Sequence, residues 1–89
     1  MQATDKPQQS PVATHQMVGE EAILINVNTG DYYSLNDTGA AFWELIDGHR
    51  TIGECARLMA KTYEVEVSEV EADLLDLAAE FQAEGLIVV

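Results

Sequence analysis

The sequence predicts a small α+β domain in which antiparallel strands come first and helices follow. Residues 12–35 carry runs of β-favouring residues that are interrupted by turn residues. After residue 36, apolar side chains recur instead at the three- and four-residue spacing of helices. Gly30–Asn36 joins the two patterns, because it places a turn glycine, a short β-favouring run and a helix-capping asparagine in that order. We expect any binding edge to lie at this stretch.

Size and charge limit the classes of protein to which this chain can belong. Its 89 residues, 47% of them hydrophobic, are enough for one domain with one small core. Sixteen acidic and four basic residues give a formal net charge of −12, and such a surface repels nucleic-acid phosphates. No apolar run approaches the ~18 residues of a membrane span, and the polar N-terminus lacks a signal-peptide pattern. We expect a cytoplasmic protein with no nucleic-acid and no membrane partner.

The first part of the chain is expected to hold a tail and three strands. Residues 1–11 are polar and predict a disordered tail, so the folded domain is expected to span residues 12–89. The predicted strands are Val12–Val18, Ala22–Val27 and Asp31–Leu35. Turn residues at Asn28–Gly30 make the last two strands antiparallel neighbours.

The second part of the chain predicts three helices. Their expected ranges are Thr38–Asp47, Thr51–Thr62 and Ser68–Glu84, and Leu86–Val89 could add a short terminal strand. Asn36 or Asp37 is expected to cap the first helix. Thr51 with Glu54, and Ser68 with Glu71, have the spacing of capping boxes for the second and third helices.

The third predicted helix carries two apolar stripes with an acidic ridge between them. Its main stripe consists of Val70, Leu74, Leu77, Ala78 and Phe81. The acids of the ridge are Glu69, Asp73, Asp76, Glu80 and Glu84. A helix on a one-sided core needs a single apolar stripe, so two stripes suggest contacts on more than one side. The alternative is that alanines fill the second stripe because they are good helix formers.

No set of residues indicates catalysis or metal binding. His15 and His49 are far apart in sequence, and no pair of Cys and His has the spacing of metal ligands. Cys55 lies on the apolar side of the second helix, where a small core residue is expected rather than a reactive thiol. We therefore expect neither enzymatic activity nor a cofactor.

The return strand Asp31–Leu35 offers a physical route to peptide binding. If it forms the edge of a small sheet, its unpaired N–H and C=O groups can accept a further strand. The alternative is that the protein's own chain covers this edge.

The motifs that follow one another from residue 19 to residue 89 match a known family. They are G-D-Y-Y-S-L-N, D-T-G-A-A-F-W-E-L-I-D-G, T-I-G-E and V-E-A-D-L-L, with E-G-L-I at the end. Their order resembles that of PqqD-like proteins, the peptide chaperones of pyrroloquinoline quinone biosynthesis. The wider class is the RiPP recognition element, which serves ribosomally made and post-translationally modified peptides. The resemblance implies a winged helix-turn-helix-like fold, with a three-stranded antiparallel sheet followed by three helices.

The resemblance also implies a binding site for the leader segment of a precursor peptide. The leader would add as a further strand beside Asp31–Leu35, in the cleft between that strand and the third helix. Tyr32, Tyr33 and Ser34 would then offer backbone hydrogen bonds. The residues so implicated are Asp31, Tyr32, Tyr33, Ser34, Leu35, Val70, Asp73, Leu74, Asp76, Leu77, Glu80 and Phe81. Among them Val70, Leu74 and Leu77 would line an apolar pocket, and Asp73, Asp76 and Glu80 would pair with basic leader residues.

By this resemblance the protein is a non-catalytic adaptor that presents a precursor peptide to a separate enzyme. In a lasso-peptide pathway, the version we favour for a short independent chain with paired tyrosines, that enzyme is a leader peptidase. The alternative is a PqqD-type chaperone for a radical S-adenosylmethionine enzyme. Remoter alternatives are a winged-helix DNA-binding protein and a structural protein that fills its own groove as a homodimer.

Overall fold

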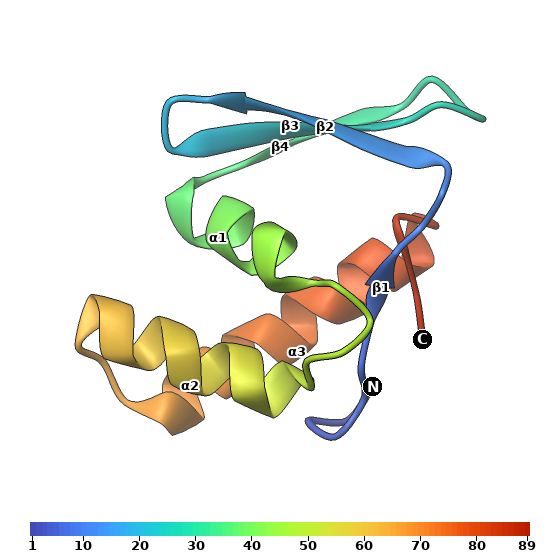
Figure 1. The fold of residues 1–89 in the computed structure, drawn as a ribbon. Coiled ribbons are helices and arrows are strands. Elements are labelled where there is room, and N and C mark those ends of the chain that lie inside the picture. The colour runs from blue at the N-terminus through green and yellow to red at the C-terminus, as the bar shows by residue number, and fades with distance from the viewer.

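The predicted three-stranded antiparallel sheet is present. In the computed structural model, which describes residues 1–89, the sheet consists of β2 (Ala13–Val18), β3 (Glu21–Asn26) and β4 (Tyr32–Leu35) in the order β2-β3-β4. Both pairings are antiparallel, so β3 is the central strand, and β2 and β4 are the edges. Figure 1 shows the sheet as one layer, with α1 (Asp37–Leu45) beneath it and α2 (Ile52–Tyr63) and α3 (Val67–Ala83) beyond α1. The predicted fold class is confirmed.

The central strand separates a buried face of the sheet from an outer face. Ala22, Leu24 and Asn26 are buried, whereas Ile23 and Ile25 alternate with them on the outer face. This alternation is the two-residue period of a strand with one face against a core. Burial of an asparagine requires hydrogen bonds, and the Asn26 side-chain oxygen accepts from two backbone N–H groups of the β3–β4 turn.

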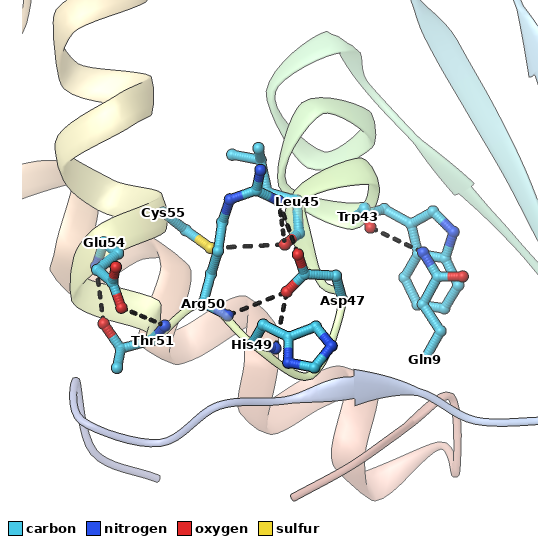
Figure 2. Close-up of polar contacts among 9 residues, drawn as sticks. All are labelled: Gln9, Trp43, Leu45, Asp47, His49, Arg50, Thr51, Glu54 and Cys55. Carbon is cyan, nitrogen blue, oxygen red and sulfur yellow. Dashed lines mark hydrogen bonds and ion pairs between the residues drawn. The ribbon is translucent and has the colours of Figure 1, made fainter.

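Local sequence explains where the first two helices begin. The side chain of Asn36, one of the two predicted candidates, accepts from the Gly39 N–H and caps α1. The predicted capping box of α2 is also present, because Thr51 accepts from the Glu54 N–H and Glu54 accepts from the Thr51 N–H, each at 3.0 Å. Figure 2 shows this reciprocal pair at the start of the helix.

The capping box predicted for the third helix is wrong. This helix begins at Val67 with Glu66 at the N-cap position, and no side chain caps it. Glu64 ends α2 in the left-handed backbone region, with φ of 57°, so only a short connector precedes α3. Ser68 consequently lies inside the first turn, where its hydroxyl is not placed to cap the helix.

An aromatic cluster joins α1 to α3 in the core. The Phe42 and Phe81 rings are stacked with centroids 6.1 Å apart, and Trp43 meets Phe81 edge to face at 5.5 Å. All three side chains are buried. Such pairs favour these offset and edge-to-face arrangements. The cluster therefore fixes the C-terminal half of α3 against the first helix.

A polar turn sets the junction between α1 and α2. The Asp47 carboxylate accepts from the N–H groups of His49 and Arg50 and forms the only ion pair, with the Arg50 guanidinium at 3.0 Å (Figure 2). These backbone hydrogen bonds lower the pKa of Asp47. Cys55 is fully buried beside this junction, and burial raises the pKa of its thiol, which agrees with a core role.

The N-terminal segment is ordered against the domain, so the expectation that residues 1–11 form a disordered tail is corrected. β1 (Gln8–Gln9) pairs with β5 (Ile87–Val88), which lies within the terminal strand predicted at Leu86–Val89, and Pro7 is buried. The carbonyls of Ala3 and Asp5 accept from the Gly53 and Ile52 N–H groups. The physical reason is that the first turn of a helix has N–H groups without helical partners. The segment supplies acceptors that its composition does not reveal.

No helix of the structure is both long enough and apolar enough to cross a bilayer.

Deletion of residues 2–6 should destabilise the domain. It removes both carbonyl acceptors from the first turn of α2, and we expect a loss of about 1–2 kcal/mol in the free energy of unfolding. Urea denaturation followed by circular dichroism measures this loss. Thr4→Ala and Lys6→Ala remove exposed side chains but keep the backbone acceptors, so each should change stability by less than about 0.5 kcal/mol. A deletion variant as stable as these two would show that the segment contributes nothing to the fold.

Candidate functional site

A groove of about 820 Å³ lies where the end of β4 meets the three helices. Seven of its twelve lining residues are hydrophobic, which suits an apolar side chain. The lining consists of Ser34, Leu35, Asn36, Thr38, Gly39, Met59, Tyr63, Val65, Val70, Asp73, Leu74 and Leu77. We refer to this set as the groove.

The third helix supplies the groove wall that the sequence predicted. Val70, Asp73, Leu74 and Leu77 follow one another at three- and four-residue spacing and all line the groove. Leu74 is buried at its base, whereas Val70 and Leu77 remain partly exposed. Ser34 and Leu35 line the groove from the strand. The structure thus brings six of the twelve predicted site residues together.

The other predicted residues lie outside the groove. Asp31 and Tyr32 are exposed where β4 begins, at the end away from the groove. Asp76 and Glu80 are exposed on α3. Phe81 is only 3% exposed, because its ring belongs to the aromatic cluster, and we assign it to the core.

The edge of β4 beside the groove carries unpaired backbone groups. The Asn26 N–H donates to the Asp31 carbonyl at 2.9 Å, so these two residues form a hydrogen-bonded pair of the ladder. Such pairs alternate along an antiparallel ladder, so Tyr33 also turns its N–H and C=O toward β3. Tyr32 and Ser34 turn theirs outward. The prediction that Tyr33 offers backbone bonds to a peptide is therefore corrected.

The sheet has two free edges, and only one adjoins the groove. β2 and β4 each pair with β3 alone. Ser34 and Leu35 of β4 line the groove, whereas no residue of β2 does. A strand added to β4 would therefore contact α3 side chains as well, while a strand added to β2 would not.

A hydrogen bond ties the start of β4 to the end of α3. The Tyr33 hydroxyl donates to the Glu84 carboxylate at 2.7 Å, and the Asn26 side-chain amide donates to the Glu84 carbonyl at 3.3 Å. The hydrogen bond to Glu84 raises the pKa of Tyr33 to about 12, and burial and the charges of Glu84 and Asp31 add to the rise. The strand and the helix are thus linked at one end and separated by the groove at the other.

The groove is apolar with negative charge at its rim. Asp73 is its only charged lining residue. The third helix contains no lysine or arginine, so its exposed Asp76 and Glu80 have no basic neighbour on the helix. An apolar ligand with a positive charge fits this field best. No cluster of His, Cys, Asp or Glu is arranged to hold a metal ion.

Sequence reasoning missed half of the groove. The missed residues are Asn36, Thr38, Gly39, Met59, Tyr63 and Val65. Tyr63 and Val65 had a usable signal in the sequence, because they are large apolar side chains at and beyond the end of a predicted helix. In the structure they are 39% and 47% exposed, as expected for residues that line a surface groove.

The comparison with protein families agrees with this arrangement. Residues 21–87 match the family described as Coenzyme PQQ synthesis protein D (PqqD). This match takes in β3, β4 and all three helices. The chain belongs to the PqqD family.

A curated relative and three solved structures resemble this PqqD-family chain. The Bifunctional coenzyme PQQ synthesis protein C/D of Methylorubrum extorquens is 32% identical over 47 residues, which make up 53% of this chain and 13% of the relative. The chain therefore matches only a small part of that protein's length.

The solved structures share the fold at low sequence identity. TbiB1 in complex with the TbiA(beta) leader peptide is 24% identical with a TM-score of 0.83, covering 90% of this chain and 93% of that one. Lasso peptide synthetase B1 complexed with the leader peptide is 21% identical with a TM-score of 0.83, covering 94% and 99%. The PqqD part of Methylobacterium extorquens PqqCD, described as a RiPP recognition element, is 20% identical with a TM-score of 0.84, covering 99% and 94%.

Glu84→Gln should lower the pKa of Tyr33 from about 12 toward its ordinary value of 10.0, because the charged acceptor is removed. A raised tyrosine pKa contributes stability that is full below pH 10.0 and lost as the pH rises toward 12. The variant should therefore lose less stability over that range than the unmodified protein. An NMR titration of the tyrosine ring carbons measures the pKa. Glu80→Gln on the same helix serves as the control, and an equal pKa change there would contradict the assignment.

Proposed function

We propose that this PqqD-family protein is a non-catalytic adaptor that binds the leader segment of a precursor peptide by strand addition to β4. The observation that carries the proposal is the free edge of β4 beside an apolar groove. Main-chain pairing along the edge supplies affinity, and the groove selects a side chain of the peptide. The boundaries of the binding domain, residues 12–89, belong to this proposal, with the N-terminal segment packed against it.

The apolar lining and the negative charge of the groove indicate which side chains a bound peptide would carry. An apolar side chain of the leader would lie on Val70, Leu74 and Leu77, and a basic residue beside it would pair with Asp73. Asp76 and Glu80 are exposed on the same helix and would attract a basic peptide at longer range. We therefore expect the bound segment to combine an apolar anchor with at least one lysine or arginine.

The partner that receives the peptide is a separate processing enzyme. Two solved relatives of this fold are leader-peptide complexes, and one of them is a lasso peptide synthetase component. These two structures favour the first candidate, an adaptor for a leader peptidase in a lasso-peptide pathway. The family match and the curated relative favour the second candidate, a peptide chaperone for a radical S-adenosylmethionine enzyme in pyrroloquinoline quinone biosynthesis. The two candidates use the same groove and differ in the enzyme.

The scarcity of basic residues on α2 and α3 argues against the DNA-binding alternative. Only Arg57 and Lys61 are basic on α2, and α3 has no basic residue. A helix that reads DNA needs positive charge to approach the phosphates. A net charge of −12 on each copy likewise opposes self-association through the groove.

Leu77→Asp and Asp73→Lys should each weaken binding of the leader peptide encoded beside the gene by at least about tenfold, or about 1.4 kcal/mol. The first places a charge in the apolar groove, and the second repels a basic peptide. Isothermal titration calorimetry measures the affinity, and circular dichroism shows that each variant is folded.

Matched controls lie on the same helix outside the groove. Leu75→Asp makes the same chemical change at another partly buried leucine, and Glu71→Lys reverses the charge of an acid on α3 that does not line the groove. If the controls weaken binding as much as the groove variants, the groove is not the peptide site.

Ser34→Pro should abolish strand addition while leaving the sheet intact. The Ser34 N–H turns away from β3, so proline removes a donor for the peptide but no ladder bond. The matched variant is Met17→Pro on β2, because the Val27 N–H donates to the Val12 carbonyl and the alternation turns the Met17 N–H outward too. We expect at least a tenfold loss of peptide affinity for Ser34→Pro and no loss for Met17→Pro. The reverse result would place the peptide on β2.

A further inference from the structure

Asn36 occupies the point where the free edge of β4 ends and the first helix begins. Its side-chain oxygen accepts from the Gly39 N–H at 2.9 Å and from the Thr38 hydroxyl at 3.0 Å. Its backbone carbonyl accepts from the Ala40 N–H at 2.8 Å. Both oxygen atoms of this residue are therefore engaged by the helix that follows.

The nitrogen atoms of Asn36 remain free. Neither its backbone N–H nor its side-chain amide has a hydrogen-bond partner within the protein. The alternation that turns the backbone groups of Tyr32 and Ser34 outward continues to Asn36, so its N–H belongs to the same free edge. Because the oxygen is held by two donors, the amide orientation is fixed, and this residue lines the groove.

The free edge of β4 thus offers different hydrogen-bonding groups along its length. Tyr32 and Ser34 each present one donor and one acceptor to a neighbouring strand, as a continuous ladder requires. Asn36 presents donors only, because its carbonyl bonds to Ala40. A peptide strand can both donate hydrogen bonds to Tyr32 and Ser34 and accept them from these residues. At Asn36 it can only accept.

We propose that Asn36 is a positioning residue that sets the register of the bound peptide. The inference rests on the proposed function. A carbonyl of the peptide accepts from the Asn36 N–H, and the side-chain amide donates to a second oxygen, either the next backbone carbonyl or a polar side chain. Pairing stops there, since the following residue, Asp37, is already helical. The apolar anchor is thereby placed at a fixed distance from the end of the ladder, over the groove.

The substitution Asn36→Asp tests the donor role while keeping the cap. Aspartate caps helices about as well as asparagine, but its second oxygen accepts where the amide donated. Asn36→Ser keeps a capping oxygen and adds no charge, and its shorter hydroxyl does not reach the position of the amide nitrogen, so it separates the loss of that donor from electrostatic repulsion. Asn28→Asp makes the same chemical change in the exposed turn between β3 and β4 and serves as the control.

The probes are short overlapping synthetic peptides that cover the leader segment encoded beside the gene. We expect both Asn36 variants to bind about tenfold more weakly than the unmodified protein, and Asn28→Asp to bind normally. Thermal unfolding should show all three variants folded. In the unmodified protein, an Asn36 side-chain amide proton should shift downfield in the NMR spectrum on saturation with peptide, because donation of a hydrogen bond deshields the proton whereas proximity alone sets no direction.

Two results would overturn the inference in distinguishable ways. If the peptide binds both Asn36 variants with normal affinity and no side-chain amide proton shifts downfield, Asn36 does not set the register, while the proposed function stands. If no peptide binds the unmodified protein, the proposed function fails and this inference fails with it.

Discussion

The packing of Phe81 against Phe42 and Trp43 is the constraint on which the groove depends. It fixes the C-terminal half of α3 against α1, and the Tyr33–Glu84 hydrogen bond joins that same end to β4. Nearer the start of α3, Val70, Leu74 and Leu77 face the groove, which lies between this helix and the end of β4. The groove therefore lies beside a helix that is held to both α1 and β4 near its C-terminal end. A groove whose walls are already in place would lower the ordering cost of the strand addition that we propose.

Much of the fold follows from local patterns in the sequence. The alternation around Ala22–Val27, the turn at Gly30 and the cap at Asn36 predicted the hairpin and the first helix, because each pattern has one favourable backbone solution. The N-terminal segment could not be predicted in this way. Its contribution lies in backbone carbonyls, which every residue carries, so composition says nothing about where they bind.

The candidate site was only half predictable for a similar reason. The periodicity of α3 revealed that Val70, Leu74 and Leu77 share a face, but periodicity alone does not separate a core residue from a groove residue. Phe81 lies on the same stripe and is buried, because its ring packs against Phe42 and Trp43 of α1. That contact joins residues remote in sequence, so the periodicity of one helix does not reveal it. Asn36 was predicted as a cap, but its free amide appears only when both the helix and the sheet register are known.

The pairing of β1 with β5 brings the beginning and the end of the chain to one side of the molecule. Figure 1 shows both termini on the side opposite the connector between α2 and α3, near which Tyr63 and Val65 line the groove. A polypeptide that continues from either terminus would therefore start away from Tyr63 and Val65. A domain fused at either terminus would begin on the side opposite the α2–α3 connector, so this arrangement is compatible with tethering the unit to a second protein.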